Sequence, residues 1–164
     1  MNQDFELKEL GQIKYFNCRE LDNTRLVVNA FTTRTGGVSR TPLDNLNLSY
    51  NVGDEESHVA ENRKIILDAL SIDYRTTVTA QQVHKDKIAL VRKEDKGKGA
   101  FKYFKRIVQT DALITDTPGI PLLMCYADCV PIFILDPVKK AIALIHSGRK
   151  GTELELTLKT FFML

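Results

Sequence analysis

Short apolar runs separated by turn-forming residues dominate the second half of the chain and predict β-strands. Thr117-Pro118-Gly119 and Asp136-Pro137 are two of the turn signals that bound these runs. The run Pro-Ile-Phe-Ile-Leu contains no charged residue, which is typical of a strand covered on both faces. The predicted strands in this half are 111–115, 120–126, 131–135 and 140–146.

The clearest helical pattern lies at 54–70. Its apolar residues share one stripe at helical spacing, Asp54 is a candidate N-cap, and Glu55 and Glu56 favour the first turn. The stripe consists of Val59, Ile66, Leu67 and Leu70. The segment is therefore predicted to form an amphipathic helix with Asn62 and Arg63 on its middle turns.

Four further segments predict strands. Segments 24–33, 77–82 and 87–91 are rich in apolar and β-branched residues. Near the end of the chain, residues 153–159 alternate leucine with polar residues, a period of two that predicts a strand. Strands packed under at least one helical layer make an α+β fold. The 164 residues are expected to form a single domain, 1–164.

Charge and composition favour a small partner. The chain has 23 basic and 21 acidic residues, so it has no strong field to attract nucleic acid or an anionic membrane surface. The N-terminal residues lack the apolar core of a signal peptide, and no apolar run reaches the roughly 20 residues of a membrane-spanning helix. The odd number of cysteines, 3, indicates reduced thiols rather than a disulfide framework. We expect a cytoplasmic protein.

Two histidines and one cysteine stand at the ends of predicted strands. His84 follows one strand, Cys129 precedes another and His146 ends a third. One thiolate and two imidazoles suit Zn²⁺ and leave a fourth tetrahedral position open. Singly, each has a plainer explanation as a structural histidine or a small buried hydrophobe. Only the set of three supports a metal site. His58, beside acidic residues in the predicted helix, is expected to be exposed and not a ligand.

The neighbours of these residues add to the metal hypothesis. Asp128 directly precedes Cys129 at the mouth of an apolar strand, and a buried carboxylate needs a partner or a use. Ser147 and Gly148 follow His146, and a glycine there lets the backbone approach a ligand closely.

A series of short motifs runs in a fixed order along residues 31–148. The motifs are Phe31-Thr32-Thr33-Arg34-Thr35-Gly36-Gly37-Val38-Ser39, Asn45-Leu46-Asn47-Leu48, Val52-Gly53-Asp54, Glu61-Asn62-Arg63, Gln82-Val83-His84, Thr110-Asp111-Ala112-Leu113-Ile114-Thr115, Ala127-Asp128-Cys129-Val130-Pro131 and His146-Ser147-Gly148. In these motifs and their order the chain resembles the laccase-domain family, which is also called the polyphenol oxidase or purine nucleoside phosphorylase family.

The resemblance implies a layered α/β/β/α sandwich with mixed sheets, like that of a bacterial toxin deamidase, and a zinc site formed by His84, Cys129 and His146. It also implies that purine nucleosides and phosphate are substrates, with phosphorolysis of adenosine, inosine or methylthioadenosine and deamination of adenosine. Copper fits less well than zinc, because a multicopper centre needs more than the 3 histidines of this chain.

The resemblance also suggests roles for polar residues outside the three ligands. Asp128 and Asp111 are the acid/base candidates for deamination. Arg63, and with it Arg34 and Lys150, could bind phosphate through cationic hydrogen bonds. Asn47 could orient the sugar or the base.

The end of the chain departs from the family pattern. Arg149 stands where members usually have tryptophan, and the usual C-terminal third of the domain does not follow Gly148. The fold is therefore expected to be incomplete at this end, which would expose strand edges and favour a homo-oligomer. Two other functions stay open: a thiol hydrolase or deamidase with Cys129 as nucleophile, and an inactive metal-binding or interaction module.

Overall fold

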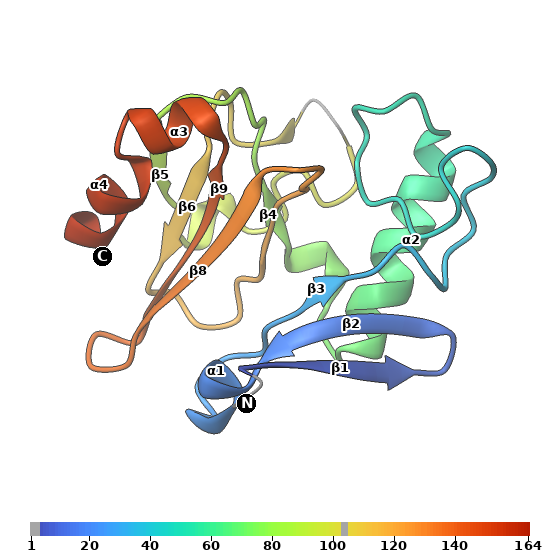
Figure 1. Cartoon of the computed structure of the whole chain (residues 1–164), viewed down its shortest axis with the longest axis horizontal. Helices are drawn as coiled ribbons and strands as arrows, with labels where there is room; N and C mark the ends of the chain where they lie inside the picture. The colour runs from blue at the N-terminus through green and yellow to red at the C-terminus, as the bar shows by residue number, and fades with distance from the viewer. Residues whose placement is uncertain (1–3, 103–104) are drawn as a thin grey trace. The chain divides into compact units, whose positions relative to one another are not determined.

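A computed structural model of the chain describes residues 4–102 and 105–164. The chain divides into two compact units, Met1–Tyr74 and Arg75–Leu164, and each has its own sheets (Figure 1). A compact unit is not by itself a domain that folds alone, so the single domain over 1–164 stays a prediction. The two units are described separately below.

The first unit contains a three-stranded antiparallel sheet and one long helix. The sheet order is β1-β2-β3. Its strands are β1 (Phe5–Leu10), β2 (Ile13–Cys18) and β3 (Phe31–Thr32), and its helices are α1 (Arg19–Asn23) and α2 (Glu56–Ala69). Ile13, Tyr15 and Asn17 alternate with exposed residues along β2, so one face of this sheet is covered.

Two predicted boundaries in this unit were too wide. The strand expected over 24–33 is only Phe31–Thr32, because Thr24 caps α1 by hydrogen bonds to Leu21 and Arg25 then takes a left-handed conformation, φ 56°. Helix α2 begins at Glu56, and its N-cap is Glu55 rather than Asp54. The Asp54 carboxylate is instead the centre of a loop network that is described with the candidate site.

The second unit contains a four-stranded mixed sheet and a two-stranded parallel sheet. In the larger sheet, with order β5-β6-β9-β8, only the β5–β6 pair is parallel. Its strands are β5 (Ile88–Leu90), β6 (Ala112–Thr115), β8 (Val130–Asp136) and β9 (Ala141–Ser147). The smaller sheet pairs β4 (Val78–Thr79) with β7 (Leu122–Leu123). The strands predicted between residues 77 and 146 are all present, though β4, β5 and β7 are shorter than predicted.

Two apolar clusters cover the two faces of the larger sheet. On one face, Leu113 of β6 and Leu144 of β9 pack with Val78 of β4 and its neighbours. On the other face, Ala112 and Ile145 pack against Leu156. The order of layers in this unit is therefore small sheet, large sheet, helix, as expected for strands that are apolar on both faces.

The C-terminal residues form helices, so the strand predicted over 153–159 is wrong. The structure has α3 (Arg149–Glu153) and α4 (Leu156–Met163) there. Leu154 and Leu158 are exposed, whereas Leu156 and Thr160 are fully buried. The buried positions are four apart, which is a helix period, and the leucines at alternate positions never share a buried face.

The α+β class predicted from the sequence is confirmed: the described residues form three sheets, one of them mixed, and few helices. Among the described residues, no helix combines the length and the apolar character needed to cross a membrane.

Candidate metal centre

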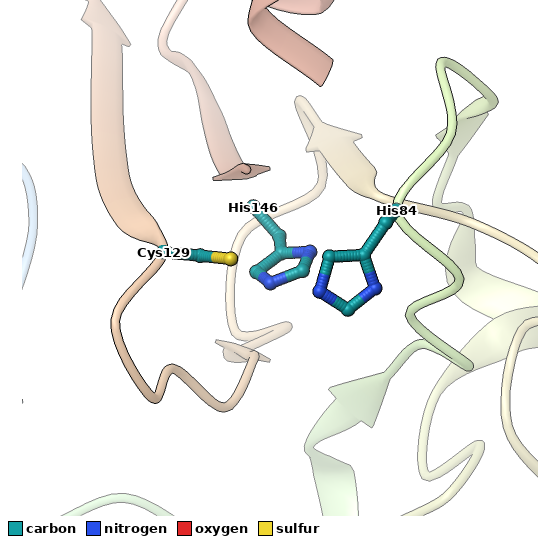
Figure 2. A group of neighbouring side chains, drawn as sticks. All are labelled: His84, Cys129 and His146. Atoms are coloured by element: carbon teal, nitrogen blue, oxygen red, sulfur yellow. The ribbon is translucent and has the colours of Figure 1, made fainter. Parts of the chain in front are cut away.

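Three side chains that are far apart in the sequence meet in the second unit. The ligand atoms of His84, Cys129 and His146 lie within 4.8 Å of one another, and Figure 2 shows the three side chains converging. His84 lies in the loop between β4 and β5, Cys129 directly precedes β8, and His146 belongs to β9. No other such group of His, Cys, Asp or Glu occurs in the described part of the chain.

Strand register places His146 in this group. His146 lies two residues beyond Leu144 on β9, so the two side chains share the face of the large sheet that packs on β4. β6 runs antiparallel to β9 with Ala112 opposite Ile145, which sets Asp111 opposite His146. The His146 N–H donates to the Asp111 carbonyl oxygen at 2.8 Å. His146, a candidate metal ligand, and Asp111, a buried carboxylate, are thus cross-strand neighbours.

The carboxylate of Asp111 holds both histidines. It is fully buried, and its Oδ1 lies 2.9 Å from Nδ1 of His146. It also accepts hydrogen bonds from the backbone N–H groups of Val83, His84 and Lys85, at 2.9 to 3.2 Å. Burial by itself would raise the pKa of Asp111, but the hydrogen bonds from His146 and from this backbone segment outweigh it and lower the pKa. Asp111 is therefore a carboxylate at neutral pH.

This carboxylate fixes the tautomer of His146. A carboxylate accepts hydrogen bonds, so Nδ1 of His146 carries the hydrogen, and Nε2 keeps its lone pair for a metal. His84 has a left-handed backbone, φ 58°, which the three N–H bonds to Asp111 hold in place. The two imidazole rings meet edge to face with centroids 4.7 Å apart.

Gly148 leaves the room that this centre needs. A Cβ on Gly148 would lie 3.0 Å from the Cys129 sulfur and 3.2 Å from Cδ2 of His84. Any larger residue would therefore press on two of the three candidate ligands. This agrees with the sequence-based expectation that glycine allows a close approach here.

The donor set fits a metal ion that prefers nitrogen and sulfur. One thiol and two imidazoles are typical zinc ligands, and three protein ligands leave a coordination position for substrate. Neither the His84 ring nor the Cys129 sulfur forms a hydrogen bond within residues 4–102 and 105–164. Asp111 is thus fully hydrogen-bonded, whereas the His84 ring and the Cys129 sulfur stay available to bind a metal.

Two other predicted site residues of this unit lie at the surface. Asp128 is exposed and adopts a left-handed conformation, φ 75°, so the expectation that its carboxylate is buried is wrong. The strand that would bury it begins only at Val130. Lys150 is exposed on the first turn of α3, two residues after Gly148.

The remaining predicted site residues belong to the first unit. Arg34 is exposed, and its Nε donates to the Asp44 carbonyl at 2.6 Å. Arg63 is 4% exposed; its Nε donates to the Leu48 carbonyl and its guanidinium lies 4.5 Å from the Tyr50 ring centroid. Arg63 falls on the buried stripe of α2 with Asn62, at the spacing of Val59 and Ile66. This spacing, which can be read from the sequence, indicates that the Arg63 side chain does not face solvent.

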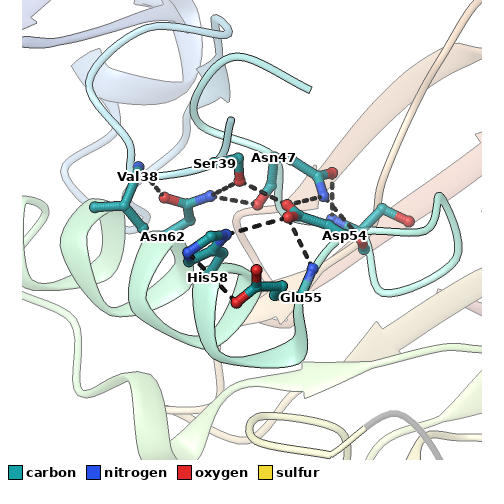
Figure 3. Close-up of polar contacts among 8 residues, drawn as sticks. Val38, Ser39, Asn47, Asp54, Glu55, His58 and Asn62 are labelled. Atoms are coloured by element: carbon teal, nitrogen blue, oxygen red, sulfur yellow. Dashed lines mark hydrogen bonds and ion pairs between the residues drawn. The ribbon is translucent and has the colours of Figure 1, made fainter. Parts of the chain in front are cut away.

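Asn47 joins a polar network around Asp54 (Figure 3). Its amide donates to Oδ2 of Asp54 at 2.8 Å and to the Ser49 carbonyl, and its oxygen accepts from the Ser49 N–H. Ser39 donates to the same Asp54 oxygen at 2.6 Å. Asn62 is fully buried and bonds Val38, Ser39 and the Asn47 carbonyl.

His58 is also part of this network, not an exposed residue as expected. Its side chain is 20% exposed, with Nδ1 3.4 Å from Asp54 and Nε2 3.7 Å from Glu55. Burial alone would raise the pKa of Asp54, yet the bonds from Asn47, Ser39, the Glu55 N–H and His58 lower it. The sequence showed these residues in separate motifs, and only the loop conformation brings them together.

Comparison with known proteins agrees with this architecture. Residues 28–163 match the family described as multi-copper polyphenol oxidoreductase laccase. This chain belongs to that family. The match covers both the loop network of the first unit and all three candidate ligands of the second.

Named relatives and solved structures extend the comparison. The chain is 39% identical over 130 residues to "Purine nucleoside phosphorylase YlmD" of Bacillus subtilis (strain 168), covering 79% of this chain and 47% of the relative. It is 37% identical over 125 residues to the protein of the same name from Geobacillus stearothermophilus, covering 76% and 46%. The crystal structure of the latter protein superposes with a TM-score of 0.91 at 31% identity, covering 98% of this chain and 58% of that one.

A second solved structure, the hypothetical protein YfiH of Bacillus licheniformis, superposes with a TM-score of 0.88 at 36% identity, again over 98% of this chain and 58% of the other. The chain thus spans about half the length of the curated relatives it matches.

Proposed function

We propose that this chain carries the metal centre of a zinc-dependent purine nucleoside phosphorylase, with purine nucleosides and phosphate as substrates. The observation that carries the proposal is the convergence of His84, Cys129 and His146 within 4.8 Å. The names of the relatives support the substrate class. Phosphorolysis of adenosine, inosine or methylthioadenosine is the leading reaction, and deamination of adenosine is the second.

Zinc suits the site better than copper does. A thiolate with two imidazoles is a usual zinc donor set, whereas a multicopper centre needs more histidines than the 3 in this chain. When bound, Zn²⁺ would supply a Lewis acid that polarises a substrate atom. The chain itself supplies the geometry, because Asp111 orients His146 and holds the backbone of His84.

The two aspartates have different roles in this proposal. Asp111 is buried and accepts from His146 and three backbone N–H groups, so we assign it to positioning rather than to proton transfer. Asp128 is exposed and adjacent to Cys129, and it is our candidate to move a proton to the leaving ammonia in deamination.

Phosphate would be bound by cations. Phosphorolysis breaks the bond between C1′ and N9 and forms one between C1′ and a phosphate oxygen, so the attacking anion must be held beside the sugar. Lys150 is exposed in the second unit, which also holds the three candidate ligands, and it is our candidate for direct phosphate contact there. Arg34 is exposed in the first unit and is a separate candidate for binding an anion. Arg63 and Asn47 are hydrogen-bonded within the first unit, and we assign them to shaping the loop of that unit.

The test is metal content together with turnover on the purified, unchelated chain. We expect about one zinc per chain and release of free base from adenosine or inosine only when phosphate is present. His84→Ala and Cys129→Ser should lose zinc and turnover together. The matched controls change the same residue types in the first unit: His58→Ala should keep its zinc, and Cys18→Ser should keep both zinc and turnover.

Other outcomes would replace the proposal. Zinc without turnover would favour an inactive metal-binding module. Turnover that survives in both His84→Ala and Cys129→Ser would sink the zinc mechanism. A metal-free protein whose Cys129 reacts rapidly with an alkylating agent would instead favour a thiol hydrolase.

A further inference from the structure

Gln82 connects the segment that carries His84 to the segment that leads to Cys129. Its Nε2 donates to the Cys125 carbonyl at 2.6 Å, and its Oε1 accepts from the Cys125 N–H at 2.9 Å. One side-chain amide thereby binds both backbone polar groups of a single residue. This is the bonding that a paired strand would give, and it occurs just past the last paired residues of β4 and β7, Thr79 and Leu123.

Tyr126 connects the same segment to the strand of His146. Its hydroxyl donates to the Ile145 carbonyl at 3.1 Å, and its ring centroid lies 5.7 Å from that of His146. Burial, with a smaller contribution from Cys125, raises the pKa of Tyr126 far above its usual range. The hydroxyl therefore remains a hydrogen-bond donor.

The three candidate ligands are thus joined in pairs by a second layer of side chains. Asp111 joins the His84 backbone to the His146 ring, Tyr126 joins the Cys129 segment to β9, and Gln82 joins the His84 and Cys129 segments. Supporting contacts of this kind usually govern how well a site holds its metal. Cys129 has the least direct support, since no hydrogen bond to its sulfur occurs within the described residues.

We propose that Gln82 is a positioning residue that places the Cys129 thiolate on the metal. The proposal rests on the metal site of the proposed function. Between Cys125 and Cys129 the chain bends at residues 127–129, where Asp128 is left-handed, so fixing the Cys125 backbone helps to fix the position of the Cys129 sulfur. Without the two amide bonds this bend is released, and the two histidines lose their thiolate partner while Asp111 still holds them.

The experiment uses Co²⁺ as the probe, because a cobalt–thiolate bond produces a sulfur-to-metal charge-transfer absorption that histidine ligands do not. Gln82→Met keeps the length of the side chain and removes both polar atoms. Gln82→Glu keeps the acceptor and removes the donor. The matched control is Gln81→Met, since within residues 4–102 and 105–164 the Gln81 side chain accepts one long bond, 3.4 Å, from the Gln109 N–H.

We expect Gln82→Met to bind Co²⁺ roughly 10- to 100-fold more weakly and to lose most of the charge-transfer band per bound cobalt. Gln82→Glu should show an intermediate loss, and Gln81→Met should match the parent chain. Far-ultraviolet circular dichroism identifies any variant that has not folded, and if Gln82→Met fails to fold, Gln82→Glu gives the decision.

The proposal is overturned if the folded variants keep the parent band and affinity. A structural effect alone would lower the thermal midpoint without changing the band per bound cobalt, and that result also counts against it. If the parent chain itself binds no Co²⁺, the metal site of the proposed function fails first, before any Gln82 variant is compared.

Discussion

Each unit of this protein contains a carboxylate, at most 5% exposed, at the centre of a polar network, and the two networks differ in what the partner histidine faces. Asp54 in the first unit accepts from Ser39, Asn47 and the Glu55 N–H. Asp111 in the second unit accepts from His146 and three backbone N–H groups. In both cases hydrogen bonds overcome burial and lower the pKa of the carboxyl group.

The difference lies in the histidine that each carboxylate faces. His58 has its second ring nitrogen 3.7 Å from the Glu55 carboxylate, so both of its ring nitrogens face carboxylates of the protein. His146 instead has a ring nitrogen within 4.8 Å of the ligand atoms of His84 and Cys129. A satisfied network stabilises a loop, whereas a network that leaves soft donors pointing to one place creates a binding site. A histidine–carboxylate pair therefore indicates a site only when the rest of the ring lacks a protein partner.

The largest expected effect on stability comes from removing the Asp111 carboxylate, the centre of the polar network in the second unit. Asp111→Ala leaves three backbone N–H groups and the His146 ring without their acceptor in a buried place. We expect the free energy of unfolding to fall by about 3–5 kcal/mol, measured by urea denaturation. Asp116→Ala is the control, because that carboxylate is 54% exposed in its ion pair with Arg92 and should matter little. A fall below about 1 kcal/mol would contradict the role of Asp111.

The next largest effect is expected from removing the Asn62 amide, which is part of the polar network of the first unit. Asn62→Leu leaves the Val38 N–H and the Asn47 carbonyl without their buried partner. The expected loss is about 2–4 kcal/mol of unfolding free energy, with zinc affinity per folded chain unchanged because all three ligands belong to the second unit. Asn51→Ala, at an exposed position, is the control. A loss of zinc in folded Asn62→Leu would show that the networks are not independent.

A smaller effect, confined to the metal centre, is expected from Gly148→Ala. The added Cβ would press on the Cys129 sulfur at 3.0 Å and on His84 at 3.2 Å, so zinc affinity should fall roughly 10- to 100-fold in a competition titration. Gly151→Ala, three residues along, meets only ordinary contacts starting at 3.5 Å. As a helix position it should gain up to about 1 kcal/mol of stability and keep its zinc. Equal zinc affinity in both variants would refute the crowding argument.

The smallest expected effect is a pH dependence. The folded pKa of Asp54 lies below its ordinary value of 3.8, so its bonds stabilise the fold fully above that value and are lost as the pH falls through the folded pKa. Acidification below about pH 4 should therefore destabilise the parent chain more steeply than Asp54→Asn, by up to about one proton in the slope. Unfolding free energies across the acid range test this, and parallel curves would exclude Asp54 as a contributor.

Residue types and local periods determined much of this protein in advance. The strands of the second half and helix α2 follow from apolar spacing. The candidate metal ligands could also be selected from the sequence, because a chain with 3 histidines and 3 cysteines offers few soft donors, and the three candidates end or flank predicted strands. Gly148 marked the place where the backbone approaches them.

What the sequence left open was decided by contacts between distant segments. The β6–β9 register places the Asp111 carboxylate against Nδ1 of His146, and helix packing buries Arg63. Packing of Leu156 on Ala112 and Ile145 selects a helix where alternation predicted a strand. The spacing of apolar residues along the sequence shows only which residues share a face of a helix or strand. Burial and hydrogen-bond partners depend on what covers that face, and that is a property of the folded chain alone.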